Sequence, residues 1–286
     1  MQTLALSSMP SMLSLYAKAA RKKGHAGELP ALSVSVAGVR ANAQDVKTYE
    51  KICHFPQSRF LPATFLHILA FPLHMRLLTD PTMPLKPMGL VHVRNTLRQL
   101  RPVEKGELLH IECSIGESRE VEAGLEFDIL TRIEASGELV YEGISTNLRR
   151  QSSPSAGGKK QHQAFDALDV IQTWSLGSSL GRQYGAVSGD RNPIHLWPVT
   201  AKLFGFKRHI AHGMWSKARC LAALTDDIAG QPFELEVVFK TPVFLPAKVE
   251  FSRTSTTAKD AEGRKVDFRL RSSSGKPHLE GRLTLI

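Results

Sequence analysis

The chain has 286 residues, of which 42% are hydrophobic and 22% are charged, and its formal net charge is +10. This is the composition of a globular protein long enough for two domains, and no apolar run is long enough to cross a bilayer. The positive charge suits nucleic acid, a polyphosphate ligand or an acidic protein. Because Lys and Arg are spread along the chain without an aromatic-interleaved basic stripe, we expect no nucleic-acid binding.

The first 24 residues predict an amphipathic terminal helix. Their positive charges follow the mildly apolar part, whereas a secretory signal places such charges before it, so we expect a cytoplasmic protein. Cys53, Cys113 and Cys220 lie far apart and form no CxxC pair. We therefore expect buried thiols in a reducing compartment, with neither a disulfide framework nor a zinc site.

A strand, a buried helix and four further strands are predicted in the first half of the chain. Leu32–Val36 alternates with period two, as strands do, and Phe60–Leu78 is apolar almost all round, which favours a helix wrapped inside a sheet. Pro72 is expected to kink this helix or to end its first segment. The four strand-like runs that follow are residues 89–94, 107–115, 121–134 and 138–148.

The second half repeats this layout after a polar stretch. Residues 151–163 are rich in Ser, Gly and Lys and predict a linker between domains at 1–150 and 164–286. A surface loop within one domain is the less favoured alternative. The second series consists of a strand at 169–175, a helix at 212–229, and strands at 233–240, 247–256, 265–272 and 278–285.

Candidate acid–base residues lie before the second long helix. Asp190 and His195 are five residues apart in a polar stretch that contains Pro193. Proline fixes its own φ and disfavours a helical residue before it, so we expect a stiff loop that does not wind into a helix. A carboxylate and an imidazole held together can share one water molecule, which is the equipment of general acid–base catalysis.

The stretch resembles the MaoC-like, R-specific enoyl-CoA hydratases and dehydratases. The matching residues are Ser188-Gly189-Asp190, Asn192-Pro193-Ile194-His195, Ala201, Gly205-Phe206 and Ile210-Ala211-His212-Gly213-Met214. By position, the resemblance implies that Asp190 and His195 are catalytic and that the Gly213 amide lies in the oxyanion hole.

The resemblance also implies an α+β double hotdog, with two long helices each wrapped by an antiparallel sheet. The two units would form a pseudo-dimer within one chain and share one continuous sheet. Pairing the two helices puts Leu61-Pro62-Ala63-Thr64 where Ala211-His212-Gly213-Met214 stands in the second unit. Because the first unit lacks the Gly and the Asp/His loop, we expect it to be catalytically degenerate. Whether two chains also form a homodimer is left open.

Other residues of the stretch are assigned to substrate binding, each beside a structural alternative. Ser188 and Asn192 either contact substrate or fix the loop by hydrogen bonds, and His212 either contacts substrate or caps the helix. Trp197 stands where many relatives have an acidic or amide residue, and it is expected either to line the pocket or to change how the loop is held. Met214 is assigned both to the pocket and to packing. His209 is expected on a solvated basic edge or against coenzyme A phosphates.

The resemblance implies reversible hydration of trans-2-enoyl thioesters of coenzyme A or of an acyl carrier protein, in fatty acid metabolism. No metal and no cofactor beyond the thioester carrier is expected. A hotdog thioesterase and a non-catalytic acyl-thioester binder are the alternatives. The acyl chain length, the carrier and the physiological direction stay open at this point.

Overall fold

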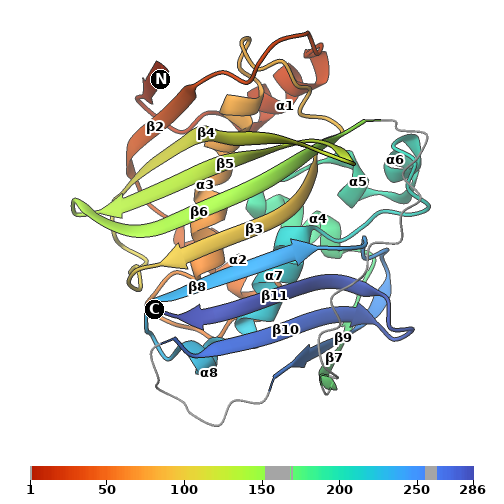
Figure 1. The fold of residues 1–286 in the computed structure, drawn as a ribbon. Helices are drawn as coiled ribbons and strands as arrows, with labels where there is room; N and C mark the ends of the chain where they lie inside the picture. The colour runs from red at the N-terminus through yellow and green to blue at the C-terminus, as the bar shows by residue number, and fades with distance from the viewer. Residues whose placement is uncertain (1, 152–167, 169, 255–262) are drawn as a thin grey trace.

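Eleven strands of the described chain form one continuous sheet, shown in Figure 1. The computed structural model describes all residues except 1, 152–167, 169 and 255–262. The strand order is β1-β2-β4-β5-β6-β3-β8-β11-β10-β9-β7, and every neighbouring pair is antiparallel except the parallel pair β1 and β2. The strands are β1 Gln2–Leu6, β2 Leu32–Val39, β3 Val91–Gln99, β4 Leu109–Val121, β5 Gly124–Ala135, β6 Glu138–Arg150, β7 Val170–Leu176, β8 Phe233–Phe239, β9 Ala247–Arg253, β10 Lys265–Ser272 and β11 Pro277–Leu285.

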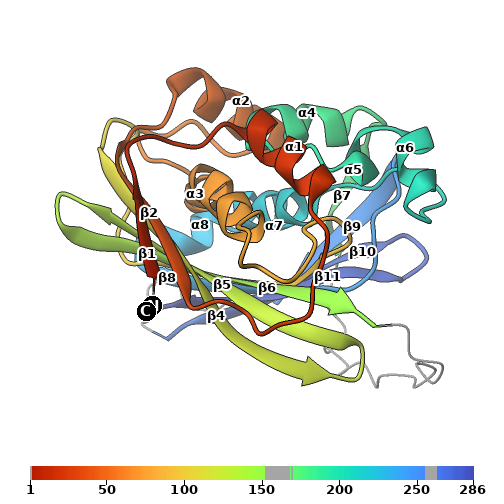
Figure 2. The same cartoon turned by 90° about the horizontal axis from the view of Figure 1, so that it is seen from above.

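The helices cover one face of this sheet. Figure 2 shows α3 and α7 against the sheet, with α1, α2 and α4 on the far side of them. The helices are α1 Met12–Arg21, α2 Ala43–Cys53, α3 Ala63–Leu78, α4 Leu180–Ser188, α5 Pro193–Leu196, α6 Pro198–Leu203, α7 Gly213–Ala222 and α8 Thr225–Ile228. A helix enclosed on both sides has no solvent face, which explains why the sequence of α3 is apolar almost all round. This layout agrees with the expected double hotdog.

The two long helices begin in equivalent ways. α3 starts at Ala63 directly after Pro62, and α7 starts at Gly213 directly after His212. The expected pairing of the two quartets is therefore confirmed at the level of helix position. Pro72 lies inside α3, so the alternative that it ends a first segment is wrong, and a kink at Pro72 stays a prediction. Neighbouring Leu73 is fully buried, and such packing holds a helix together across one lost backbone hydrogen bond.

Several boundaries differ from those expected. The sequence pattern missed β1 and α2, and the helix expected at 212–229 is divided into α7 and α8. The domain division stays a prediction, and its linker lies outside the described residues except for Gln151. All three cysteines are free and buried, as expected.

In the described part of the chain, no helix combines the length and the apolar character that a membrane span requires.

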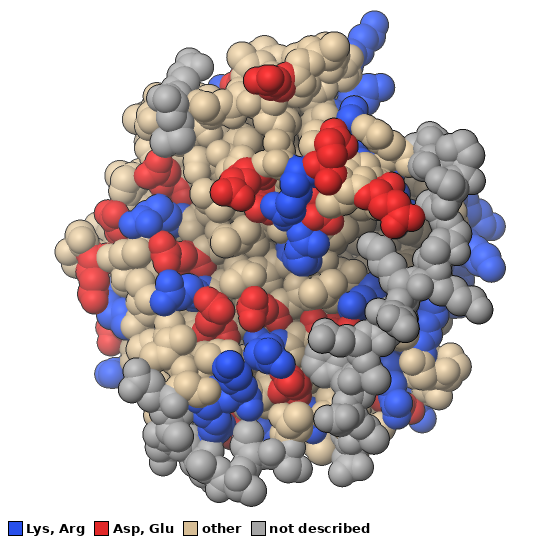
Figure 3. All heavy atoms as spheres, viewed as in Figure 1, with Lys and Arg blue, Asp and Glu red and all other residues tan. Residues whose placement is uncertain are grey.

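The outer face of the sheet carries charges of both signs (Figure 3). Arg98 pairs with Glu142 and with Glu234 at 3.5 Å between nitrogen and oxygen in each case, and Arg282 pairs with Asp267 at 2.6 Å. The two ion pairs of Arg98 join β3 to its neighbours β6 and β8. On this face the basic residues are interspersed with acidic ones, so they form no stripe of one sign.

Strands β3 and β8 join the two halves of the sheet, and a buried lysine of α7 binds both. Leu97 of β3 lies opposite Leu235 of β8. The Lys217 ammonium donates to the Asn95 carbonyl at 3.1 Å, to the Asn95 side-chain oxygen at 2.5 Å and to the Leu235 carbonyl at 3.2 Å. Burial lowers the pKa of Lys217 well below its usual range. Three acceptors satisfy all the hydrogens of this group, which makes its burial tolerable.

We expect Lys217→Ala to lower the free energy of unfolding by about 3 kcal/mol, because it leaves a cavity and strips buried acceptors of their donor. Chemical denaturation measures this change. The matched control is Lys248→Ala, at an exposed position in β9, which should change stability by less than about 0.5 kcal/mol. Equal stability of the two variants would show that Lys217 does not hold the two strands together.

Candidate active site

The segment between α4 and α5 presents Asp190. α4 ends at Ser188, and Gly189 has a φ of +74°, a left-handed conformation that glycine adopts readily. The Ser188 hydroxyl accepts the Asp190 amide hydrogen at 3.2 Å between heavy atoms. The Asn192 side chain accepts from the Ile194 amide at 3.4 Å and caps α5. In the structure Ser188 and Asn192 thus fix the backbone, the structural alternative given for both.

Pro193 starts a helix instead of preventing one. It is the first residue of α5, where a missing N–H costs nothing and the fixed φ suits the helix. His195 therefore stands on a short helix, and the expectation of a non-helical loop is wrong at this residue. His195 is still held rigidly, because the Asn192 cap and Pro193 fix the direction in which α5 leaves the Asp190 segment.

The two oxygens of the Asp190 carboxylate have different surroundings. Oδ1 accepts the Asn192 amide hydrogen at 3.1 Å and the Tyr16 hydroxyl hydrogen at 3.1 Å. Oδ2 lies 3.8 Å from Nε2 of His212, which is too far for a hydrogen bond. About 30% of the side chain is exposed. One oxygen is therefore held by two donors, and the other is available to a ligand.

His195, like Asp190, has one polar atom held by a hydrogen bond and one that is available to a ligand. Its Nδ1 lies 2.9 Å from the Ile210 carbonyl, which can only accept, so Nδ1 carries the hydrogen and Nε2 has the lone pair. The side chain is buried. Burial lowers the pKa of His195, and the Asp190 carboxylate opposes this change without cancelling it. At neutral pH the ring is therefore uncharged and Nε2 is a hydrogen-bond acceptor.

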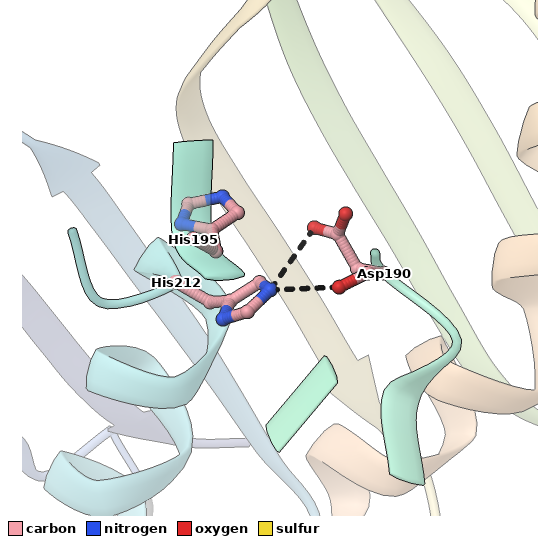
Figure 4. Close-up of side chains that lie close together, drawn as sticks. All are labelled: Asp190, His195 and His212. Carbon is pink, nitrogen blue, oxygen red and sulfur yellow. Dashed lines mark hydrogen bonds and ion pairs between the residues drawn. The ribbon is translucent and has the colours of Figure 1, made fainter. Parts of the chain in front are cut away.

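His212 supports both of these groups (Figure 4). Its Nε2 donates to the Asp190 backbone carbonyl at 2.9 Å, and its ring stacks on that of His195 with centroids 3.8 Å apart. It precedes α7, but its side chain makes no capping hydrogen bond, so side-chain capping is wrong. Burial lowers the pKa of His212 to about 3, which keeps the ring neutral.

A single point lies within reach of the three side chains. One polar atom each of Asp190, His195 and His212 lie within 4.8 Å of one another. One water molecule with hydrogen bonds of about 2.8 Å can bridge atoms at this separation. Burial acts to raise the pKa of Asp190, but the His212 and His195 rings and the donors of Asn192 and Tyr16 outweigh it and hold the pKa below its usual range. The site thus combines a carboxylate with a neutral imidazole.

Gly213 is the first residue of α7, directly after His212. First-turn N–H groups have no partner within their helix, and the helix dipole favours negative charge there. A Cβ atom at this position would come within 3.0 Å of the Phe239 ring of β8. The close packing on Phe239 accounts for a glycine here, and any larger side chain would crowd that ring.

Comparison with known proteins points to the same chemistry. Residues 167–274 match the family described as MaoC like domain. The chain is 29% identical over 225 residues to 3-hydroxyacyl-thioester dehydratase X of Mycobacterium tuberculosis, an alignment that covers 77% of this chain and 79% of the relative. The chain carries a MaoC-like domain and is a hydro-lyase. Its double-hotdog fold also agrees with solved MaoC-like structures.

Among these structures is that of HtdX from Mycobacterium tuberculosis. It matches with a TM-score of 0.75 at 27% identity, over 89% of this chain and 100% of that one. A MaoC-like dehydratase from Phytophthora capsici matches with a TM-score of 0.70 at 18% identity, over 90% of this chain and 96% of that one, which shows the shared fold. Both likenesses extend well beyond the matched domain into the N-terminal half.

The other residues assigned to the site have varied surroundings. Trp197 is 52% exposed, with the Arg182 guanidinium stacked 3.9 Å from its ring centroid. Met214 is buried in the core. Their contact with substrate stays a prediction. His209 is not on a solvated edge as expected: it is 2% exposed and donates to the Ser178 carbonyl at 2.7 Å.

Sequence reasoning missed Tyr16 as part of the site. Its hydroxyl bonds to Asp190 across a separation of 174 residues. It also accepts the Arg191 amide hydrogen at 2.8 Å. Nothing local marks Tyr16, because it lies in an amphipathic helix where an aromatic residue ordinarily packs. Only the folded arrangement identifies it.

Asp190, His195 and His212 resemble a metal-binding set by composition and spacing. The hydrogen bonds argue against a metal ion. Nε2 of His212 is protonated toward the Asp190 carbonyl, and Oδ1 of Asp190 already accepts from two donors. Free lone pairs remain on Oδ2 of Asp190 and Nε2 of His195, and His212 offers only Nδ1, which is directed away from the Asp190 carbonyl, whereas a metal site needs ligands that converge on one point. The arrangement suits water better than a metal ion.

We therefore expect the turnover rate to be unchanged after incubation with EDTA and after addition of Zn²⁺ or Mg²⁺ to the dialysed protein. Elemental analysis of the purified protein should show substoichiometric metal. Loss of turnover on chelation, with recovery when one metal is restored, would contradict this reading of the hydrogen bonds.

Proposed function

We propose that this hydro-lyase adds water to trans-2-enoyl thioesters to give (R)-3-hydroxyacyl thioesters, and removes it in reverse, as part of fatty acid metabolism. The supporting observation is the pair of acceptors, Oδ2 of Asp190 and Nε2 of neutral His195, on side chains whose polar atoms approach within 4.8 Å. The dehydratase named among its relatives acts on 3-hydroxyacyl thioesters by its name, which supports the same substrate class here.

The two acceptors orient the attacking water. Water donates one hydrogen to Asp190 and the other to His195, so that a lone pair on its oxygen is directed at C3 of the substrate. The C3–O bond forms as one of the two bases takes a proton, and the π electrons of the C2–C3 bond shift toward the thioester oxygen. Return of that proton to C2 completes the addition of one hydrogen and one hydroxyl.

Gly213 is proposed to stabilise the charge that develops on the thioester oxygen. Its amide starts α7, so the helix dipole and an unpaired N–H act at the same point. One such donor typically lowers the barrier by about 3 kcal/mol. The absence of a side chain lets the thioester approach this amide closely.

The carrier of the acyl group is coenzyme A or an acyl carrier protein. Both are negatively charged, and the net charge of +10 favours the approach of either one. A thioesterase would use the same fold and would release a free thiol. A non-catalytic binder has no need for a carboxylate and an imidazole that share one water, so this pair favours an enzyme.

Asp190→Asn and His195→Ala are each expected to lower kcat/KM for hydration by roughly 100- to 10,000-fold, because each removes one acceptor of the attacking water. Loss of the enoyl-thioester absorbance measures the rate, with crotonyl-CoA and longer enoyl-CoAs as substrates. Assaying free thiol in the same reactions separates hydration from thioester hydrolysis.

Asp226→Asn and His110→Ala are matched controls at exposed positions, and both should keep the rate of the unaltered protein. Circular dichroism establishes that each variant is folded. Undiminished turnover in either active-site variant removes that residue from the mechanism, and thiol release without hydration replaces the proposal with a thioesterase.

A further inference from the structure

We infer that Tyr16, on the N-terminal helix α1, is a positioning residue of this active site. The inference rests on the proposed function. Tyr16 does not meet the substrate carbons in this account, and it acts through Asp190. It holds Oδ1 of the carboxylate so that Oδ2 remains the oxygen that faces the attacking water. The site thereby depends on a residue from the half of the chain that lacks the Asp/His motif.

The hydrogen bonds of Tyr16 have a defined direction. Its oxygen accepts from the Arg191 amide at 2.8 Å, so its own hydrogen is free to point at Oδ1 of Asp190, 3.1 Å away. An oxygen that accepts one hydrogen bond is a better donor in the next. Tyr16 thus connects two successive residues of the segment that carries the carboxylate.

Packing of α1 keeps the hydroxyl in place. Leu15 and Ala19 are each 2% exposed and lie in the hydrophobic core. Met12 lies on the same side of α1 and approaches Gly189, where a Cβ would stand 3.3 Å from its Cγ. Residues at positions 12, 15, 16 and 19 follow the spacing of one helix face. This face orders α1 against the site, so the tyrosine is already oriented before substrate binds.

Tyr16 is a fixed donor over the working pH range. Burial and the neighbouring Asp190 carboxylate raise the pKa of its hydroxyl, so it stays protonated. Its hydrogen bond is one of the influences that hold the pKa of Asp190 below its usual range. The other titratable groups that act on Asp190 electrostatically are His92 of β3, Tyr184 of α4, His195 of α5 and His212 before α7.

Tyr16→Phe tests the inference, since it removes the hydroxyl and keeps the ring. We expect kcat to fall roughly 10- to 100-fold, the range for a lost hydrogen bond to a charged group, with KM within about twofold. The acid limb of the pH–rate profile should also move to higher pH. The sign follows because Asp190 must be ionised: without this donor its proton affinity rises, and the Asp190–His195 pair gains its first proton at higher pH.

Tyr141→Phe is the matched control. Tyr141 is a fully buried tyrosine of β6 whose hydroxyl has no hydrogen-bond partner among the described residues. This variant should keep kcat and the pH profile of the unaltered protein. Thermal unfolding of both variants separates a local effect from loosening of the fold. A Tyr16→Phe protein with unchanged kcat and acid limb would overturn the inference.

The same experiment distinguishes the inference from the function on which it rests. If the unaltered protein hydrates enoyl thioesters and Tyr16→Phe behaves identically, only the role of Tyr16 fails. If the unaltered protein does not turn over any enoyl thioester, the proposed function itself fails. A fall in kcat with an unmoved acid limb and a lowered unfolding temperature would assign Tyr16 to structure alone.

Discussion

The proposed chemistry depends on one constraint: two hydrogen-bond acceptors of different chemistry must meet a single water molecule. Asp190 provides a carboxylate with one oxygen held by Tyr16 and Asn192, and His195 provides the lone pair of a neutral ring whose other nitrogen is bonded to Ile210. Water between two acceptors has no free hydrogen to offer the substrate. Its oxygen lone pairs are therefore turned outward, which is the orientation that addition to C3 requires.

Hydrogen bonds from both halves of the chain hold these catalytic candidates in place. Burying a carboxylate and two imidazoles is costly unless each polar atom has a partner, and here most partners are backbone groups at element ends. His212 bonds the Asp190 carbonyl and stacks on His195, so it fixes the two groups relative to each other. The half without the motif contributes through Tyr16 and through the Lys217 bonds to Asn95. That half is therefore not independent of the site.

Much of the arrangement was predictable from local sequence. Strand alternation, the apolar sequence of α3 and the matching starts of α3 and α7 follow from periodicity and from the two halves of the motif. Other features depend on distant contacts. Among the described strands β1 pairs with β2 alone, and Tyr16 and His212 acquire their roles from partners far along the chain or across the fold. Pro193 begins α5 because proline suits a first helical position, and α3 continues through Pro72, so neither proline acts as the end of a helix.

Hydration in D₂O tests the central claim most directly. If Asp190 and His195 act on one water from one side of the substrate, the hydroxyl at C3 and the deuterium at C2 are added to the same face. Nuclear magnetic resonance of the 3-hydroxyacyl product at early time points, with crotonyl-CoA as substrate, reports the relative configuration at the two carbons. The account predicts the single diastereomer of syn addition. An anti product, or a mixture of diastereomers before any back reaction, would contradict it.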